Sequence, residues 1–325
     1  MDIGYDMGFG AHKVAIGSAE SQHIVEVVSH VAAAIDPKFS ELVVGRRKGG
    51  PSLVQLPNGA AYWVGAGAHD MGRPLEANDV AKLTGSPEVK AIMLKALSTV
   101  DHGGVIHNLA VGLPLSMLEA GSTYPEIVRR WLTGTAFGKV DGKQVEVDIR
   151  NVVISSQPGA AFAGWAYGVD GDALQPADVL AREVAVMSIG FGTVEMMVLR
   201  GAVPVPRFTA SYPIGVRRYL ELDNPNRSFS LGELDTNLRK MGKALNEGAL
   251  ETWSRELFGT IEERWGQVKN VARFGTLLVC GGGAILLKTV LRKTFPSAVI
   301  LDDPVAAVAI GLQRIAHFND SGNAQ

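Results

Sequence analysis

The residues best suited to phosphate chemistry lie near the N-terminus, in a glycine-rich turn with an acid on one side and a lysine on the other. The turn reads Asp6-Met7-Gly8-Phe9-Gly10-Ala11-His12-Lys13. Because glycine allows positive φ and a close approach of the main chain, consecutive N–H groups in such a turn can converge on phosphate oxygens. Asp6 could then hold Mg²⁺ through water and Lys13 could neutralise phosphate charge, with His12 nearby. Taken alone, a Gly-x-Gly hairpin with flanking charges is usually an ordinary turn.

A second turn of the same kind follows in mid-chain. It reads Ser188-Ile189-Gly190-Phe191-Gly192-Thr193-Val194-Glu195 and lies between β-rich runs at 184–187 and 196–199. Two such hairpins facing each other would clamp a polyphosphate from both sides, with the amides of Gly190, Phe191 and Gly192 as donors. Thr193 adds a hydroxyl group. The occurrence of both turns in one chain favours a phosphate site over two unrelated turns.

The third candidate element is a glycine triplet late in the chain. It reads Leu277-Leu278-Val279-Cys280-Gly281-Gly282-Gly283-Ala284, an apolar strand that runs into three glycines and an expected helix over 285–295. Glycines here would let a flat ring or a ribose approach the backbone, and a helix N-terminus favours negative charge. A Rossmann dinucleotide site is the natural rival, but the Gly-x-Gly-x-x-Gly spacing is absent and no βαβ unit with a ribose-binding acid follows.

Composition limits the classes of protein to consider. Of 325 residues, 46% are hydrophobic and 20% charged, as in ordinary globular proteins, and the length suggests two domains. The formal charge of -2 argues against direct binding of nucleic acid or anionic membrane. The single cysteine, Cys280, cannot form an internal disulfide, and there is no signal-peptide pattern or apolar run of about 20 residues. These features predict a cytoplasmic protein.

Short β-branched runs alternate with helical spacing, which predicts an α/β fold. The expected strands are 14–16, 24–28, 109–111, 152–154, 184–187 and 277–279. A capping box of Ser230 and Glu233 begins a long helical region, and Asn246-Glu247-Gly248 is expected to end its first helix before a second begins. Near the C-terminus, Asp302-Asp303-Pro304 resembles an N-cap with proline at the first helical position, leading into a helix over 305–318.

The three glycine elements in this order resemble the superfamily of actin, heat-shock chaperones and sugar kinases. Asp6-x-Gly8 with Lys13 is most similar to the first loop of plasmid-segregating (ParM-like) and archaeal actin-like proteins, and Gly281 to Ala284 resembles the adenosine motif. The resemblance covers nearly the whole chain. It implies an actin-like (ribonuclease H-like) fold, in which two similar α/β domains flank a cleft that binds ATP (or GTP) with Mg²⁺.

Two further segments resemble the connectors between the domains of that family. In the first, Val152-Val153-Ile154-Ser155-Ser156-Gln157-Pro158-Gly159, the resemblance implies that Gln157 orients the attacking water, because phosphoryl transfer to water needs an in-line nucleophile. Asp6 and Gln157 are therefore the expected catalytic residues. A glutamine that merely begins a helix is the alternative. The second connector, 302–311, carries small residues suited to a hinge.

One position departs from the family pattern. The second loop of the family usually begins with aspartate and ends in Thr-x-Asp, whereas Ser188 and Glu195 stand at those positions here. Ser188 carries no charge near Mg²⁺, so Asp6 is expected to be the main acidic metal partner. Hydrolysis would then be slow or its metal dependence altered, while nucleotide binding through backbone amides should survive.

The resemblance also implies a division of the chain. We expect a first domain of residues 1–183 plus 305–325, with a small inserted subdomain at about 30–65. The second domain is expected to span 184–304, with a helical inserted subdomain at about 205–272.

The resemblance implies an ATPase that polymerises into filaments for plasmid DNA segregation or similar intracellular positioning. Its partners would be further copies of itself and a DNA-bound adaptor protein, not DNA or membrane. A small-molecule kinase of the same fold is one alternative and would need a general base, for which Asp101 and Asp170 are unsupported candidates. A nucleotide-binding scaffold with little hydrolysis is the other.

Overall fold

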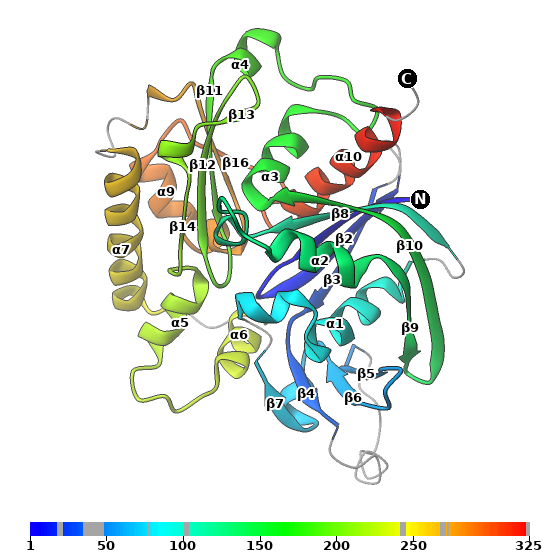
Figure 1. Cartoon of the computed structure of the whole chain (residues 1–325). Coiled ribbons are helices and arrows are strands. Elements are labelled where there is room, and N and C mark those ends of the chain that lie inside the picture. The colour runs from blue at the N-terminus through cyan, green and yellow to red at the C-terminus, as the bar shows by residue number, and fades with distance from the viewer. Residues whose placement is uncertain are drawn as a thin grey trace.

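Two β-sheets, each with helices packed against it, make up the protein (Figure 1). The computed structural model describes residues 1–17, 22–34, 49–76, 79–100, 104–240, 245–266, 271 and 273–322. Within these residues the strands form a ten-stranded sheet and a six-stranded sheet. The predicted α/β class is confirmed, and each of the six strands expected from the sequence lies within a strand of the structure.

The first sheet is built around a β-hairpin and a parallel neighbour. Its strands, in spatial order, are β3 (Gln22–Val28), β2 (Ala11–Gly17), β1 (Asp2–Met7), β8 (Val105–Leu113), β10 (Lys143–Ser156), β9 (Gly134–Val140), β5 (Ser52–Gln55), β6 (Ala61–Val64), β4 (Val31–Ala33) and β7 (Arg73–Leu75). β1 pairs antiparallel with β2 and parallel with β8. The first glycine turn therefore joins β1 to β2, two inner strands of the sheet.

The second sheet repeats this arrangement with fewer strands. Its strands are β13 (Val203–Pro204), β12 (Val194–Arg200), β11 (Glu183–Ile189), β15 (Thr276–Cys280) and β16 (Val299–Ile300), with β14 (Ala210–Tyr212) paired to β12. β11 pairs antiparallel with β12 and parallel with β15. The second glycine turn thus lies between the first two strands of its sheet, as the first turn does, and the glycine triplet follows the parallel neighbour.

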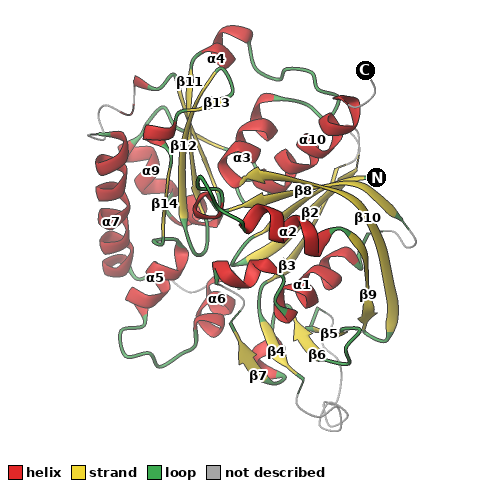
Figure 2. Ribbon diagram, viewed as in Figure 1, coloured by secondary structure: helices red, strands yellow, loops and turns green. Residues whose placement is uncertain are grey.

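Two helices lie between the sheets and join them. α3 (Gln157–Ala166) packs on β11 and β12, α10 (Ala307–Gly322) packs on β1 and β8, and the two helices pack on each other (Figure 2). Their apolar side chains form one buried cluster with residues of both sheets. The helices touch at glycines, because a Cβ added to Gly311 would lie only 1.7 Å from the carbonyl oxygen of Ala160. The small residues expected in the second connector are therefore required by helix contact.

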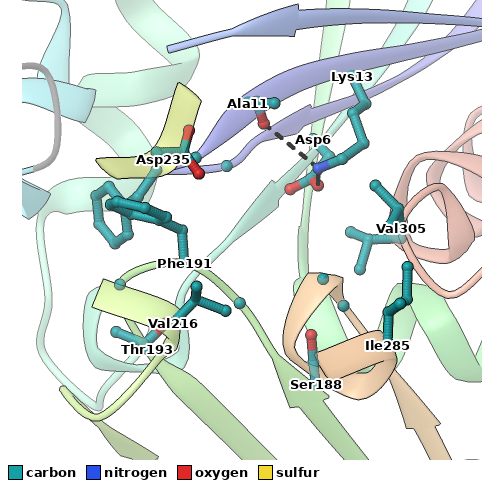
Figure 3. A pocket seen from close by; sticks show the side chains of 18 of the residues that line it. Asp6, Ala11, Lys13, Ser188, Phe191, Thr193, Val216, Asp235, Ile285 and Val305 are labelled. Carbon is teal, nitrogen blue, oxygen red and sulfur yellow. Dashed lines mark hydrogen bonds and ion pairs between the residues drawn. The ribbon is translucent and has the colours of Figure 1, made fainter. Parts of the chain in front are cut away.

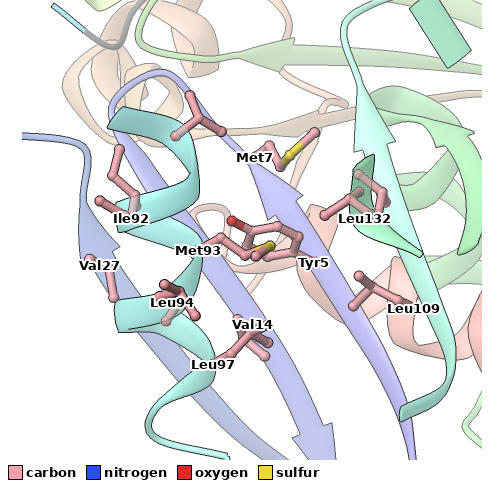
Figure 4. Packing of buried hydrophobic residues seen from close by; sticks show 14 of the residues in the cluster. Tyr5, Met7, Val14, Val27, Ile92, Met93, Leu94, Leu97, Leu109 and Leu132 are labelled. Carbon is pink, nitrogen blue, oxygen red and sulfur yellow. The ribbon is translucent and has the colours of Figure 1, made fainter. Parts of the chain in front are cut away.

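Each sheet is covered on its outer face by other helices. On the first sheet, α1 (Pro87–Leu97) packs over β2 and β3, where Met93 lies beside Tyr5 and Leu97 beside Val14 (Figure 4), and α2 (Tyr124–Leu132) packs on β10. The helices of the second half are α4 (Ala177–Ala181), α5 (Val216–Asp223), α6 (Leu231–Arg239), α7 (Glu247–Trp265), α8 (Gly282–Leu286) and α9 (Lys288–Thr294). The two outer faces give two separate hydrophobic cores.

Most helix ends agree with the sequence, but three predictions need correction. Ser230 and Glu233 form the expected capping box of α6. Asn246, however, does not end that helix; its side chain accepts a hydrogen bond from Ala249 N and begins α7. The Asp303 side chain likewise accepts a hydrogen bond from Ala306 N, and α10 begins at Ala307, two residues later than expected. The helix after the glycine triplet starts earlier, at Gly282, and is broken at Leu287 into α8 and α9.

The expected domain boundaries remain a prediction. The small subdomain proposed at 30–65 includes residues 35–48, which lie outside the described part of the chain, as do 241–244, 267–270 and 272 of the helical subdomain. Of the residues that the structure describes, no helix is both long enough and apolar enough to cross a membrane.

The contact between α3 and α10 generates a stability test. Gly311→Ala should lower the free energy of unfolding by at least about 2 kcal/mol, because the new methyl group meets the α3 backbone, which cannot rotate away. Gly259→Ala is the matched control: it lies in the exposed middle of α7 with no atom within 4 Å of an added Cβ, and should be stabilising by up to about 1 kcal/mol. Urea unfolding of both variants measures the difference, and equal effects would contradict the proposed contact.

Candidate functional site

The three glycine elements meet at one pocket of about 250 Å³ between the two sheets (Figure 3). Fourteen of the residues singled out from the sequence line it: Asp6, Gly8, Phe9, Gly10, Ala11, Lys13, Gln157, Ser188, Gly190, Phe191, Gly192, Thr193, Gly281 and Gly282. His12, Gly283 and Ala284 are not among its lining residues. The turns at Gly8 and Gly190, separated by about half the chain, therefore face the same space.

A buried carboxylate organises the first-sheet side of the pocket. The Asp6 side chain receives hydrogen bonds from Lys13 Nζ to Oδ2 and from Gln157 Nε2 to Oδ1, each at 3.0 Å. Strand register explains the first contact, because Asp6 and Lys13 lie directly opposite each other in β1 and β2. The N-terminus of α3 supplies the second. The two expected catalytic residues, Asp6 and Gln157, are thus in direct contact, and the Gln157 amide is oriented by Asp6.

The tips of the two hairpins interlock. A Cβ on Gly10 would lie 2.8 Å from Phe191 Cβ, and one on Gly192 would lie 2.6 Å from Phe9 Cδ2. The second glycine of each Gly-x-Gly turn is therefore needed to admit the phenylalanine of the opposite turn. The second turn is also anchored to the start of α5, whose Val216 and Arg217 amides donate to the carbonyls of Gly190 and Phe191 at 3.0 and 2.8 Å.

The three glycines of the triplet have different roles: two allow close packing and one leaves space in the pocket wall. Gly281 has φ of 87°, and a Cβ on Gly281 or Gly283 would lie within 2.3 Å of Ile189 at the end of β11. These two glycines are required for close packing against the second hairpin. Gly282 has no atom within 4 Å of an added Cβ, so it leaves open space in the pocket wall. Ala284 is fully buried.

His12 faces away from the pocket. Alternate residues of a strand point to opposite faces, so Ala11 and Lys13 face the pocket while His12 lies with Met7 on the core side, hydrogen-bonded to the Tyr5 hydroxyl. Burial, and secondarily the nearby Lys13 charge, lower the pKa of His12 to about 3. The His12 side chain therefore does not line the pocket, and the expected contact of His12 with phosphate gains no support from its position. The ring is a neutral core residue.

Ser188 lies at the position of the second hairpin that matches Asp6 in the first. It lines the pocket and is opposite Glu195 in the β11–β12 register, as Asp6 is opposite Lys13. Glu195 turns away and receives hydrogen bonds from Leu115 N at 2.9 Å and Ser211 Oγ at 2.8 Å. Burial raises the pKa of this carboxyl group. Because Leu115 follows β8, Glu195 ties the second hairpin to the first half of the protein.

Several lining residues escaped the sequence reasoning. They come from β3, from α5 and α6, and from the segments around α8 and α10: Glu26, Val216, Asp235, Leu238, Arg239, Ile285, Leu286, Val305 and Val308. Asp235 and Arg239 are four residues apart on α6, a spacing that places an acid and a base on one helix face and could have been noticed. The scattered apolar side chains had no signal in the sequence, because only the fold brings them together.

The donor set suits a nucleotide with its metal. Asp6 offers one carboxylate, and among the described residues no three His, Cys, Asp or Glu side chains gather as a metal cluster. Mg²⁺ commonly binds one or two carboxylates and takes its other ligands from phosphates and water, so Asp6 fits a metal that arrives with the phosphates. Ile285, Leu286 and Val305 provide an apolar wall next to the space left by Gly282, which fits a flat base.

Comparison with known proteins agrees with this architecture. A family model described as the N-terminal domain of actin-like proteins matches residues 4–159. The crystal structure of the ParM protein of psk41 has a TM-score of 0.69 at 14% identity, covering 99% of this chain and 98% of that one. The chain has the actin-like fold. No curated protein sequence matches it.

Two other solved structures show the same fold for this actin-like chain. The archaeal actin homologue Ta0583, in complex with ADP, has a TM-score of 0.68 at 18% identity, covering 100% of both chains. A ParM from Clostridium botulinum, solved as a 15-stranded filament, has a TM-score of 0.72 at 17% identity, covering 97% of this chain and 98% of that one. The resemblance stated from the glycine elements is therefore confirmed for the fold. The roles of individual site residues stay predictions.

The neutral burial of His12 predicts acid sensitivity of the hairpin. The unfolded chain would take up a proton near pH 6.5 and the folded chain only near pH 3, so acidification between these values favours unfolding. His12 should lower the free energy of unfolding by up to about 1.4 kcal/mol per pH unit in this window. His12→Gln keeps an acceptor for Tyr5 and should make the free energy of unfolding depend less on pH. Urea unfolding between pH 7 and 4 measures this dependence. His23→Gln, which removes an exposed histidine, should leave it unchanged.

Proposed function

We propose that this actin-like chain binds Mg-ATP in the pocket between its two sheets, hydrolyses it slowly and assembles into filaments. The observation that carries the proposal is the convergence of two glycine hairpins and the Gly281-Gly282 segment on one pocket that holds the Asp6, Lys13 and Gln157 contact. ADP in the archaeal actin homologue supports nucleotide as the ligand. We favour ATP over GTP only by the family resemblance, so both belong in the test.

The chain's own residues have separable roles in this proposal. Amides of the two hairpins and Lys13 bind the phosphates, while Asp6 holds the position of Lys13 and Gln157. No hydrogen bond among the described residues engages Gln157 Oε1, so that atom can accept from a water and orient it for in-line attack. Mg²⁺ would supply charge neutralisation at the transferred phosphate, with Asp6 as its protein contact.

Self-association is supported by the solved relatives rather than by a contact in this chain. The structures of Alp12 and of the Clostridium botulinum ParM are filaments. Head-to-tail contacts between identical subunits generate open helical polymers. In this proposal, the nucleotide bound between the two halves of each subunit regulates these contacts. By the same resemblance we propose plasmid segregation or a related positioning role in the cytoplasm, with a DNA-bound adaptor protein as partner.

A specific observation favours slow hydrolysis over fast hydrolysis in this proposed function. Ser188 places a neutral hydroxyl at the position that matches Asp6, and the second hairpin's own carboxylate, Glu195, is turned away toward Leu115. The small-molecule kinase has less support. Its candidate base Asp170 is exposed and does not line the pocket, and Asp101 lies outside the described residues.

Nucleotide titration and sedimentation test the central proposal. ATP or GTP with Mg²⁺ should bind, and one of them should produce polymer that pellets and appears as filaments by electron microscopy. Absence of polymer with ATP, GTP and no nucleotide across a range of salt would remove the filament function. ATP consumption that requires an added alcohol would favour the kinase instead.

Gln157→Ala should separate hydrolysis from binding. Loss of the side chain that orients water should lower phosphate release by about 100-fold. Nucleotide affinity should change only a few-fold, because the phosphate-binding amides and Lys13 remain. Gln144→Ala, an exposed glutamine on the same strand that leads into α3, serves as the control and should match wild type. Equal turnover in both variants would exclude Gln157 as the water-orienting residue.

Ser188→Asp should raise ATP turnover. A second carboxylate opposite the first hairpin would add a metal contact, and a gain of roughly tenfold corresponds to about 1.4 kcal/mol of transition-state stabilisation. Ser188→Asn, which has the size without the charge, should not reproduce it. Turnover measured against Mg²⁺ concentration decides the matter, and an unchanged or lower rate for the aspartate variant would contradict the missing-carboxylate explanation.

A further inference from the structure

A polar network joins the helix α6 of the second half to the first hairpin, along one side of the pocket. Arg239 donates to three acceptors: Asp235 Oδ2 at 2.7 Å, Glu26 Oε1 at 2.9 Å and the Gly10 carbonyl oxygen at 3.2 Å. Asp235 Oδ2 also bonds to His30 Nε2 at 3.1 Å. Asp235 and Arg239 come from α6, whereas Gly10, Glu26 and His30 belong to the first half, so three of the four hydrogen bonds cross between the halves and the Arg239–Asp235 bond joins two residues of α6.

The Asp235–His30 part of the network is buried enough to matter energetically, whereas the side chains of Arg239 and Glu26 are 35% and 38% exposed. The exposed fractions are 3% for Asp235 and 7% for His30. A buried carboxylate that loses a partner is left with an uncompensated desolvation cost, whereas exposed ion pairs contribute little. Ring packing reinforces the same contact between α6 and the first half: His69 stacks on His30 with ring centroids 5.0 Å apart, and a Cβ on Gly232 of α6 would lie 2.1 Å from the His69 ring. Parting α6 from the first half would therefore break several contacts at once.

The network also reaches the phosphate-binding side chains. Glu26 lies opposite Lys13 in the β2–β3 register, and Lys13 in turn contacts Asp6. Gly10, whose carbonyl oxygen accepts from Arg239, is the glycine on which Phe191 of the other hairpin packs. A change in the position of α6 is thus transmitted to the first hairpin through two hydrogen-bonded contacts of one guanidinium group.

We propose that Arg239, Asp235 and His30 form a latch that holds the helical segment against the first phosphate hairpin and sets the rate at which nucleotide leaves the pocket. The proposal rests on the proposed nucleotide function. Arg239 and His30 are positioning residues here. Ligand escapes when the two halves part on the α6 side, and the latch must break for this to happen.

The rate of release of a fluorescent ATP analogue, chased with unlabelled ATP in stopped flow, tests the latch in the full chain. Arg239→Gln should release nucleotide at least tenfold faster than wild type. Because Arg239 lines the pocket and could touch the ligand itself, His30→Leu is the decisive variant: His30 does not line the pocket, yet its loss should accelerate release to a similar extent. The double variant should be no faster than the faster single variant, because both changes open the same latch.

Conservative and matched variants distinguish the loss of the latch from a general weakening of the structure. His30→Gln retains an amide donor for Asp235 and should restore slow release. Arg255→Gln removes the same charge from the second half, where Arg255 pairs with Glu251 of its own helix, and should release nucleotide at the wild-type rate. Wild-type release by His30→Leu would overturn the latch while leaving the proposed nucleotide function intact. Failure of the wild-type chain to bind either ATP or GTP would overturn both.

Discussion

The site depends on one buried charge. Asp6 is only 4% exposed, and a carboxylate at such a position is tolerated only when charged and hydrogen-bonding partners surround it. Its partners come from two segments that are far apart in sequence, Lys13 of the adjacent strand and Gln157 at the start of α3. Satisfying this single carboxylate therefore requires the first hairpin, the connector helix and the pocket to form together.

The same glycines serve both the fold and the site. Gly10 and Gly192 admit the phenylalanines of the opposing turns, and Gly281 and Gly283 let the helix after β15 approach β11. Flexibility of the main chain around phosphate is the usual explanation for such glycines, but here close packing already requires them. The two halves meet through tightly interlocking turns, which makes the pocket geometry sensitive to how the halves are held against each other.

The comparison with solved actin-like proteins shows that the fold persists at low identity. At 14 to 18% identity the chain superimposes on nearly the whole length of the relatives. What this fold needs from the sequence is limited: apolar alternation in the strands, small residues where α3 and α10 touch, and turns that reverse without side chains. Many sequences satisfy these conditions, so a shared fold does not by itself fix the function of the site.

The sequence alone was sufficient for the features that depend on local chemistry. Glycine turns between β-branched runs indicated both hairpins, and the capping box at Ser230 marked the start of α6. Three features of the site were determined only by the tertiary structure. The face of β2 that meets the pocket excluded His12, because strand alternation gives two faces and only packing chooses between them. The contact of α6 with the first hairpin brought in Arg239 and Asp235, which are more than 200 residues from the partners they meet in Gly10, Glu26 and His30. Glu195 points away from the pocket, because a buried carboxylate is held by whichever donors the fold brings nearest; these are Leu115 N, 80 residues away in the chain, and Ser211 Oγ, 16 residues away.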